Sequence, residues 1–120
     1  MSLPQNLVTI HPYFKLQPGR AEDAQAIMEE FVAKTKTEEA CLFYEFTING
    51  DWVFCREGYV GGEGVLTHLE NVGSVIEKML TISEMPRLEF HGPGEEIDKL
   101  REPLAELKPD FYVLSEGIRR

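Results

Sequence analysis

The sequence lacks the features that mark several large classes of protein. No segment approaches the ~18 consecutive apolar residues of a transmembrane helix, so we expect no membrane span. No basic stripe is present: 12 Lys+Arg against 21 Asp+Glu give a net charge of −9, which argues against nucleic acid or an anionic membrane surface as a partner. The first residues have neither the basic segment nor the apolar run of a secretory signal, and two cysteines are too few for a disulfide scaffold. We therefore expect a cytoplasmic protein.

The apolar content is sufficient for one packed domain over residues 1–120, since 42% of the residues are hydrophobic and 10% are aromatic. Alternation of apolar residues predicts strands, and apolar stripes at helical spacing predict helices. Pro12 cannot donate a ladder hydrogen bond, so it predicts a bulge or a sheet edge in the first strand. The predicted strands cover residues 7–16, 41–48, 53–60, 87–91 and 111–114. The predicted helices begin at residue 21, after residues 61–64 and at residue 95, the last running to 107 with a kink at Pro103.

The second and third strands should form a hairpin, because Asn49-Gly50 lies between two strand-like segments and both residues tolerate positive φ. Residue i should then pair with 101 − i or with 99 − i. In either register Cys41 and Cys55 lie several rungs apart, beyond the reach of a disulfide. An even-numbered loop would also place Tyr44 on the same sheet face as Glu57 and Tyr59 of the next strand.

This order of elements predicts a ferredoxin-like α+β fold, an antiparallel sheet with helices on one face, followed by an additional helix and strand. Both sheet faces carry apolar side chains, for example Phe43 on one and Phe46 on the other. A second copy stacked on the free face would cover it, so we expect a homodimer. A dimer of such acidic chains suits a neutral aromatic ligand better than an anion.

Four short motifs resemble the antibiotic biosynthesis monooxygenase family of small dimeric α/β-barrel proteins. A Pro-Gly turn follows the first strand, Ala40 stands where the family has Gly, and Tyr59 stands where it has Trp, nine residues before His68. The motifs are residues 15–19 (Lys-Leu-Gln-Pro-Gly), 39–44 (Glu-Ala-Cys-Leu-Phe-Tyr), 56–59 (Arg-Glu-Gly-Tyr) and His68. The resemblance implies a family core over about 7–91, an extension over about 92–120, and oxidation of electron-rich aromatic compounds by O2 without metal or flavin.

Four residues are the leading candidates for that chemistry. His68 borders the apolar stripe of its helix and would be the general base, since a neutral imidazole suits proton abstraction near pH 7. Glu57 would assist as a second catalytic group, while Tyr44 and Tyr59 would hold a phenolic substrate. The alternative is structural: a hydrogen bond between Glu57 and Tyr44, or an ion pair to an arginine, and a histidine at the rim of the core.

Two further residues complete the candidate substrate-binding set. His11 occupies the first-strand region where the related haem-degrading proteins carry a polar active-site residue, although parity places it opposite the more apolar face. Trp52 would cover the end of the core or reach the dimer contact. His91 is the last residue of the strand predicted at 87–91 and, next to Gly92-Pro93-Gly94, is interpreted as a residue of the adjoining loop. The three histidines lack the spacing of a zinc site.

We therefore predict a cofactor-independent monooxygenase acting on a small aromatic or quinol-like compound. Two alternatives stay open. The chain could be a non-catalytic module that binds a small ligand or assists assembly, or a haem-binding or haem-degrading protein with His68 as the axial ligand.

Overall fold

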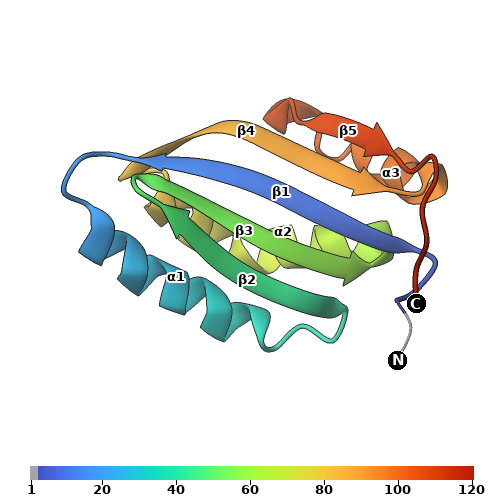
Figure 1. Cartoon of the computed structure of the whole chain (residues 1–120), viewed down its shortest axis with the longest axis horizontal. Helices are drawn as coiled ribbons and strands as arrows, with labels where there is room; N and C mark the ends of the chain where they lie inside the picture. Colours follow the sequence, from blue (N-terminus) through green and yellow to red (C-terminus); the bar gives the residue numbers. More distant parts are fainter. Residues whose placement is uncertain (1–2) are drawn as a thin grey trace.

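The computed structural model describes residues 3–120, and it has the predicted order of strands and helices (Figure 1). The second strand and the third extend further than predicted, by one residue each, and the fourth is about twice as long. The elements are β1 (Leu7–Leu16), α1 (Ala21–Thr35), β2 (Cys41–Asn49), β3 (Trp52–Val60), α2 (Gly61–Met79), β4 (Ser83–Gly92), α3 (Gly94–Arg101), the short 3₁₀ helix η1 (Ala105–Leu107) and β5 (Asp110–Val113). None of the helices among the described residues is long and apolar enough to cross a membrane.

The five strands form one sheet in the order β2-β3-β1-β4-β5. The first four strands in this order pair antiparallel with one another, which confirms the ferredoxin-like α+β prediction. The strand of the C-terminal extension, β5, joins the edge of this sheet parallel to β4. The crossover through α3 returns the chain to the same end of the sheet, and such a connection makes neighbouring strands parallel.

Strand β1 shows how the sequence determines which face is buried. Val8, Ile10, Phe14 and Leu16 are all buried on the helix side, as their alternation predicts. Of the two alternatives predicted at Pro12, the structure has an irregularity nearby and not a sheet edge, because β1 lies between β3 and β4. The irregularity occurs after Pro12, where the register with β4 shifts between residues 13 and 15.

The β2–β3 hairpin has the first of the two predicted registers, because Tyr44 pairs with Glu57 and Ile48 with Val53. A bulge between Cys41 and Phe43 shifts the pairing by one residue beyond that point. Both cysteines are free, as predicted. The hairpin therefore places the side chains of Tyr44 and Glu57 next to each other on the helix-facing side of the sheet.

The core between sheet and helices consists of two apolar clusters. The first contains residues of β1, α1, β3 and α2, such as Phe14, Phe31 and Met79. The second contains Ile97, Leu100 and Leu104 of the C-terminal extension, packed on the start of β1, the end of β4 and α2. The extension is therefore part of the core.

The extension also provides a hydrogen-bond acceptor for a backbone N–H group in the first turn of α2. The side chain of Glu96 accepts a hydrogen bond of 2.8 Å from the backbone N–H of Gly62, one of the unpaired donors of the first helical turn. Helix α3 ends at Arg101 instead of running to residue 107, and η1 follows. Pro103 has no N–H and cannot continue a helix, so it ends α3 where a kink was predicted.

Candidate active site

A cavity of about 110 Å³ lies between the sheet and the helices, where the two apolar clusters meet. Four polar side chains reach it: Tyr44, Cys55, Glu57 and His68. The remaining lining is apolar and comes from β1, α1, β2, α2, β4 and η1: Ile10, Pro12, Phe14, Phe31, Phe46, Leu69, Val72, Ile76, Leu80, Met85, Leu88 and Leu107. A larger open depression of about 970 Å³ beside residues 114–119 is surrounded by exposed residues and holds no buried titratable group.

The polar groups are positioned by regular secondary structure. Glu57 and Cys55 alternate with outward residues along β3, and Tyr44 is the direct cross-strand partner of Glu57. His68 lies in the second turn of α2, on the stripe that packs against the sheet, and is only 3% exposed. A site held by strands and helices keeps its geometry better than one held by loops.

Glu38, in the loop between α1 and β2, fixes the orientation of His68. Its carboxylate oxygens lie 3.0 and 3.1 Å from Nδ1 of His68, and one of them accepts a 2.8 Å hydrogen bond from Nδ2 of Asn71. Asn71 is anchored in turn to the backbone oxygen of Lys34. A carboxylate beside Nδ1 favours the tautomer with the proton on Nδ1, which leaves Nε2 free to accept a proton.

The other ring nitrogen of His68 faces Glu57. Nε2 of His68 and Oε1 of Glu57 are 3.3 Å apart, and the same Oε1 accepts a short hydrogen bond of 2.6 Å from the hydroxyl of Tyr59. Tyr59 is fully buried behind Glu57 and does not line the cavity. The residues therefore form a continuous chain of polar contacts in the order Glu38, His68, Glu57 and Tyr59.

Burial determines the protonation state of this chain. It raises the pKa of Glu57 to about 8, although hydrogen bonds from Tyr59 and Cys55 oppose the rise. Burial also lowers the pKa of His68, and the Glu38 carboxylate offsets part of that effect. At pH 7 the site therefore contains a protonated carboxyl and a neutral imidazole in contact, an acid and a base side by side.

Three other groups stay protonated at neutral pH. Burial is the main cause that raises the pKa of Tyr44, of Tyr59 and of the Cys55 thiol. The two cavity-lining groups, Tyr44 and Cys55, can therefore act as hydrogen-bond donors but not as nucleophilic anions.

The structure brings four of the six predicted site residues together and separates the other two. His68, Glu57, Tyr44 and Tyr59 form the site. His11 points to the opposite face of the sheet, as its parity in β1 indicates, and Trp52 lies at the start of β3, 40% exposed with the Lys15 ammonium 5.1 Å from its ring. Neither lines the cavity.

Sequence reasoning missed Glu38, Asn71 and Cys55 as members of the site. Asn71 lies three residues after His68, a helical spacing that places both side chains on one face, so this residue could have been found. Cys55 lies two residues before Glu57 in β3, so the period of the strand places it on the same face. Glu38 lies 30 residues before His68 in a loop, and no local pattern indicates where such a side chain points.

The site does not fit haem. Nδ1 of His68 is held by Glu38, so only Nε2 could serve as an axial ligand. The cavity of about 110 Å³ is also below the ~300–1,000 Å³ of typical cofactor and ligand pockets.

Comparison with known proteins supports the resemblance seen in the motifs. No protein-family model and no curated protein sequence matches the chain. The fold is that of a candidate antibiotic biosynthesis monooxygenase from Caulobacter crescentus (TM-score 0.65, 19% identity, 72% of this chain and 88% of that one) and of another from Chloroflexus aurantiacus (0.61, 16%, 72% and 92%). The predicted resemblance to the antibiotic biosynthesis monooxygenases is thereby confirmed for the fold.

One solved structure is similar over nearly the whole chain. MupZ from Pseudomonas fluorescens superimposes with a TM-score of 0.92 at 37% identity, covering 96% of this chain and 95% of that one. The chain belongs to the same family as MupZ. The two other structures each match 72% of this chain, whereas MupZ matches 96% of it. MupZ is therefore also similar to the part of the chain that those two structures do not match.

Proposed function

We propose that the protein is a cofactor-independent monooxygenase that oxidises a small aromatic or quinol-like compound with O2. The observation that carries the proposal is the contact between the imidazole of His68 and the carboxyl of Glu57 in an apolar cavity, with the Glu38 carboxylate behind the imidazole. Such a site can remove a proton from an electron-rich ring and return it elsewhere, and the direct oxidation of the resulting carbanion by O2 needs no metal or flavin.

The reaction can be written for a substrate with an acidic ring CH2 group. Nε2 of His68 takes one proton, and the imidazolium is stabilised by the Glu38 carboxylate. The carbanion passes an electron to O2, the two radicals combine, and the resulting peroxide anion regains the proton as a hydroperoxide. His68 then removes the second CH proton while the Glu57 carboxyl protonates the leaving hydroxide. The products are a ketone and water, and proton transfer from His68 to Glu57 over 3.3 Å restores the starting state.

The cavity limits the substrate that this site accepts. A dry cavity of about 150 Å³ lined by aliphatic and aromatic side chains holds one benzene ring, so a cavity of about 110 Å³ has to expand on binding to admit even a single ring. The apolar lining favours an uncharged substrate, whose hydroxyl groups would find Tyr44 as a donor. Tyr59 stands in the position of the family's Trp and supports Glu57, so in this chain that position serves the acid and not the substrate.

A homodimer is part of this proposal. The sheet face opposite the helices carries Tyr13, Phe43 and Phe54, all half-buried in the single chain. A second copy stacked on this face would remove these rings from water. A monomeric mass in light scattering at micromolar concentration would contradict this part and leave the assignment of the acid and base intact.

The test is oxygen consumption by the purified protein with a panel of hydroquinones and anthrones. We expect turnover that falls about 100-fold or more in His68→Ala, since a positioned general base contributes about 10²–10⁴-fold. Leu114→Ala, at an exposed position outside the cavity, serves as the control. Absence of O2 uptake across the panel, or unchanged turnover in His68→Ala, would overturn the proposal.

A second candidate is a redox-neutral reaction driven by acid and base alone. The pKa of Glu57, raised to about 8, favours it, because a protonated carboxyl beside a neutral imidazole is already a complete pair for proton removal and proton return. Isomerisations and eliminations of small apolar molecules require no more. Turnover that is equal with and without O2, with deuterium incorporated from solvent, would identify this chemistry.

A further inference from the structure

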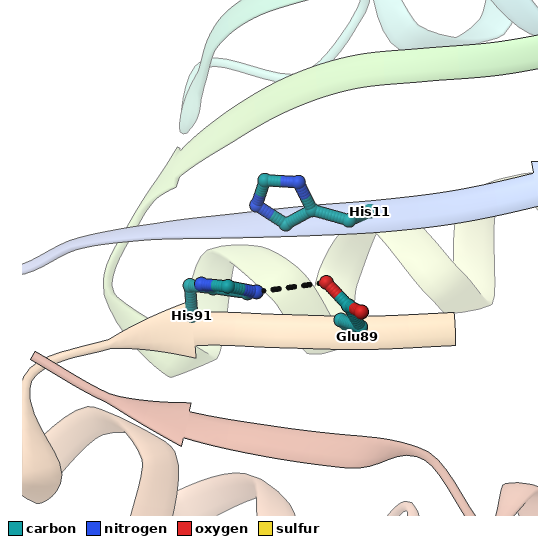
Figure 2. Close-up of side chains that lie close together, drawn as sticks. All are labelled: His11, Glu89 and His91. Carbon is teal, nitrogen blue, oxygen red and sulfur yellow. Dashed lines mark hydrogen bonds and ion pairs between the residues drawn. The ribbon is translucent and has the colours of Figure 1, made fainter. Parts of the chain in front are cut away.

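We propose a second site, for a divalent transition-metal ion, on the sheet face opposite the helices. Figure 2 shows its three ligands, His11 of β1 and Glu89 and His91 of β4. One donor atom from each lies within 4.8 Å of the other two. The site does not share a residue with the cavity, so it stands independently of the proposed oxidation chemistry.

The register of the sheet explains why these residues meet. His11 pairs directly with Glu89 across β1 and β4, and the neighbouring pair joins Thr9 to His91. Glu89 and His91 are two residues apart in one strand and therefore point to the same face. The sequence spacing of the histidines, 80 residues, gives no indication of this contact, which is why the prediction found no zinc-ligand pattern. His91 also lies in β4 and not in the predicted loop.

One of the three ligand pairs already has the spacing that a metal ion requires. Nε2 of His91 lies 3.0 Å from Oε1 of Glu89, near the ~3.3 Å that separates two ligands of a tetrahedral ion with bonds of about 2.0–2.1 Å. The rings of His11 and His91 have their centroids 4.3 Å apart. Thr9 holds Nε2 of His11 at 2.8 Å, and the ring of Tyr112 stacks on His91 at 4.5 Å, so both imidazoles are already oriented.

The donor set selects the class of ion. Two imidazoles and one carboxylate, with a fourth position open, suit Zn²⁺ and the neighbouring late first-row divalent ions, whereas Ca²⁺ and Mg²⁺ prefer oxygen ligands only.

The positive charge of Arg87 opposes the binding of a cation at this site. Arg87 donates from Nε to Glu89, and its guanidinium lies over the ring of Tyr13. In the single chain the Arg87 side chain is 57% exposed and can turn away from Glu89, whereas the Glu89 side chain is only 5% exposed. The ion would therefore replace Arg87 as the main positive partner of Glu89. Removal of Arg87 should strengthen metal binding.

The test is a titration of chelator-treated full-length protein with Zn²⁺ by calorimetry, with Co²⁺ as a spectroscopic probe. We expect one ion per chain, Co²⁺ absorption bands typical of low coordination, and at least a 10-fold loss of affinity in His11→Ala and in His91→Ala, since even the loss of an outer-shell partner costs about 10–100-fold. Arg87→Gln should bind more tightly, and His68→Ala should bind like the native protein. Circular dichroism of each variant checks that it is folded.

Two outcomes would overturn the proposal of a metal site. Absence of stoichiometric Zn²⁺ binding in native protein and in Arg87→Gln would show that the three residues form an ion-pair network alone. Binding that persists unchanged in both histidine variants would show an adventitious ion elsewhere on an acidic surface. Because His68→Ala removes the proposed oxidation without touching these ligands, failure of one proposal is distinguishable from failure of the other.

Discussion

Nε2 of His68 and Oε1 of Glu57 lie 3.3 Å apart, so the base and the acid of the site can exchange a proton directly. The two groups belong to a helix and to the strand on which that helix packs, and neither can move away without opening the core. The carboxylate of Glu38 lies 3.0 Å from Nδ1 of His68, and the hydroxyl of Tyr59 donates a hydrogen bond of 2.6 Å to Oε1 of Glu57. The proposed chemistry consequently depends on a relay of four residues, two of which touch no substrate.

The first prediction concerns Glu38 as a positioning residue. In Glu38→Gln the amide retains the size of the carboxylate but not its charge, so the imidazolium of His68 loses its stabilising partner. We expect kcat to fall about 10–100-fold, as for loss of the supporting group behind a ligating histidine, with little change in KM. The acidic limb of the kcat profile should also move to lower pH, since the carboxylate raises the pKa of His68.

The control for Glu38 is the adjacent, exposed Glu39→Gln, which should leave both kinetic constants and the pH profile unchanged. Equal kcat values and superimposable profiles for Glu38→Gln and the native protein would show that Glu38 has no part in the relay.

The second prediction is a pH dependence of stability due to Glu57. Its pKa is about 8 in the folded chain and 4.5 in an exposed carboxyl, so between these values the unfolded state gives up a proton that the folded state keeps. The contribution of Glu57 to the free energy of unfolding is therefore largest below pH 4.5. It falls as the pH rises toward 8, by at most about 1.4 kcal/mol per pH unit. His68 acts in the opposite sense below pH 6.5, because its pKa is lowered on folding.

Glu57→Gln should remove the alkaline part of this dependence. The variant cannot ionise, so urea unfolding at a series of pH values should show no loss of stability between pH 6.5 and 8, and it should exceed the native protein in stability at pH 8. A native protein whose free energy of unfolding is flat over that interval would contradict the buried, protonated carboxyl.

Local patterns predicted the fold well because each element carries its own signal. The hairpin at Asn49-Gly50 limited the pairing to two registers, of which the structure has the one that pairs Tyr44 with Glu57, and both registers place these two side chains on one sheet face. What could not be predicted depends on contacts distant in sequence. Glu38 reaches His68 from a loop, and His91 meets His11 only because β4 pairs with β1.

The third prediction concerns the link between the extension and the family core. In Glu96→Ala the backbone N–H of Gly62 loses its acceptor in a buried position, and an unsatisfied buried donor costs about 1–3 kcal/mol. Substituting the exposed neighbour, Glu95→Ala, provides the control and should change stability little. Urea unfolding measures both. A Glu96→Ala variant as stable as Glu95→Ala would mean that water replaces the carboxylate at the start of α2.

The fourth prediction concerns Leu107, which the extension contributes to the cavity. Of the residues that line the cavity, Leu80 and Leu107 are the two with exposed side chains, at 43% and 51%, so the cavity meets the surface between them. Leu107→Ala should widen this mouth and lower KM about 10-fold or more for substrates larger than one ring, because even one methylene in an apolar pocket changes discrimination by about 1–3 kcal/mol, or about 10–200-fold.

Leu107→Trp should have the opposite effect and exclude the larger substrates while leaving the relay of Glu38, His68, Glu57 and Tyr59 intact. Leu114→Ala is the matched control, since Leu114 is 49% exposed and does not line the cavity. Ratios of kcat/KM between one-ring and two-ring substrates measure the effect independently of any loss of folded protein. Ratios that stay constant across all three variants would place the mouth of the cavity elsewhere and leave the extension with its structural role alone.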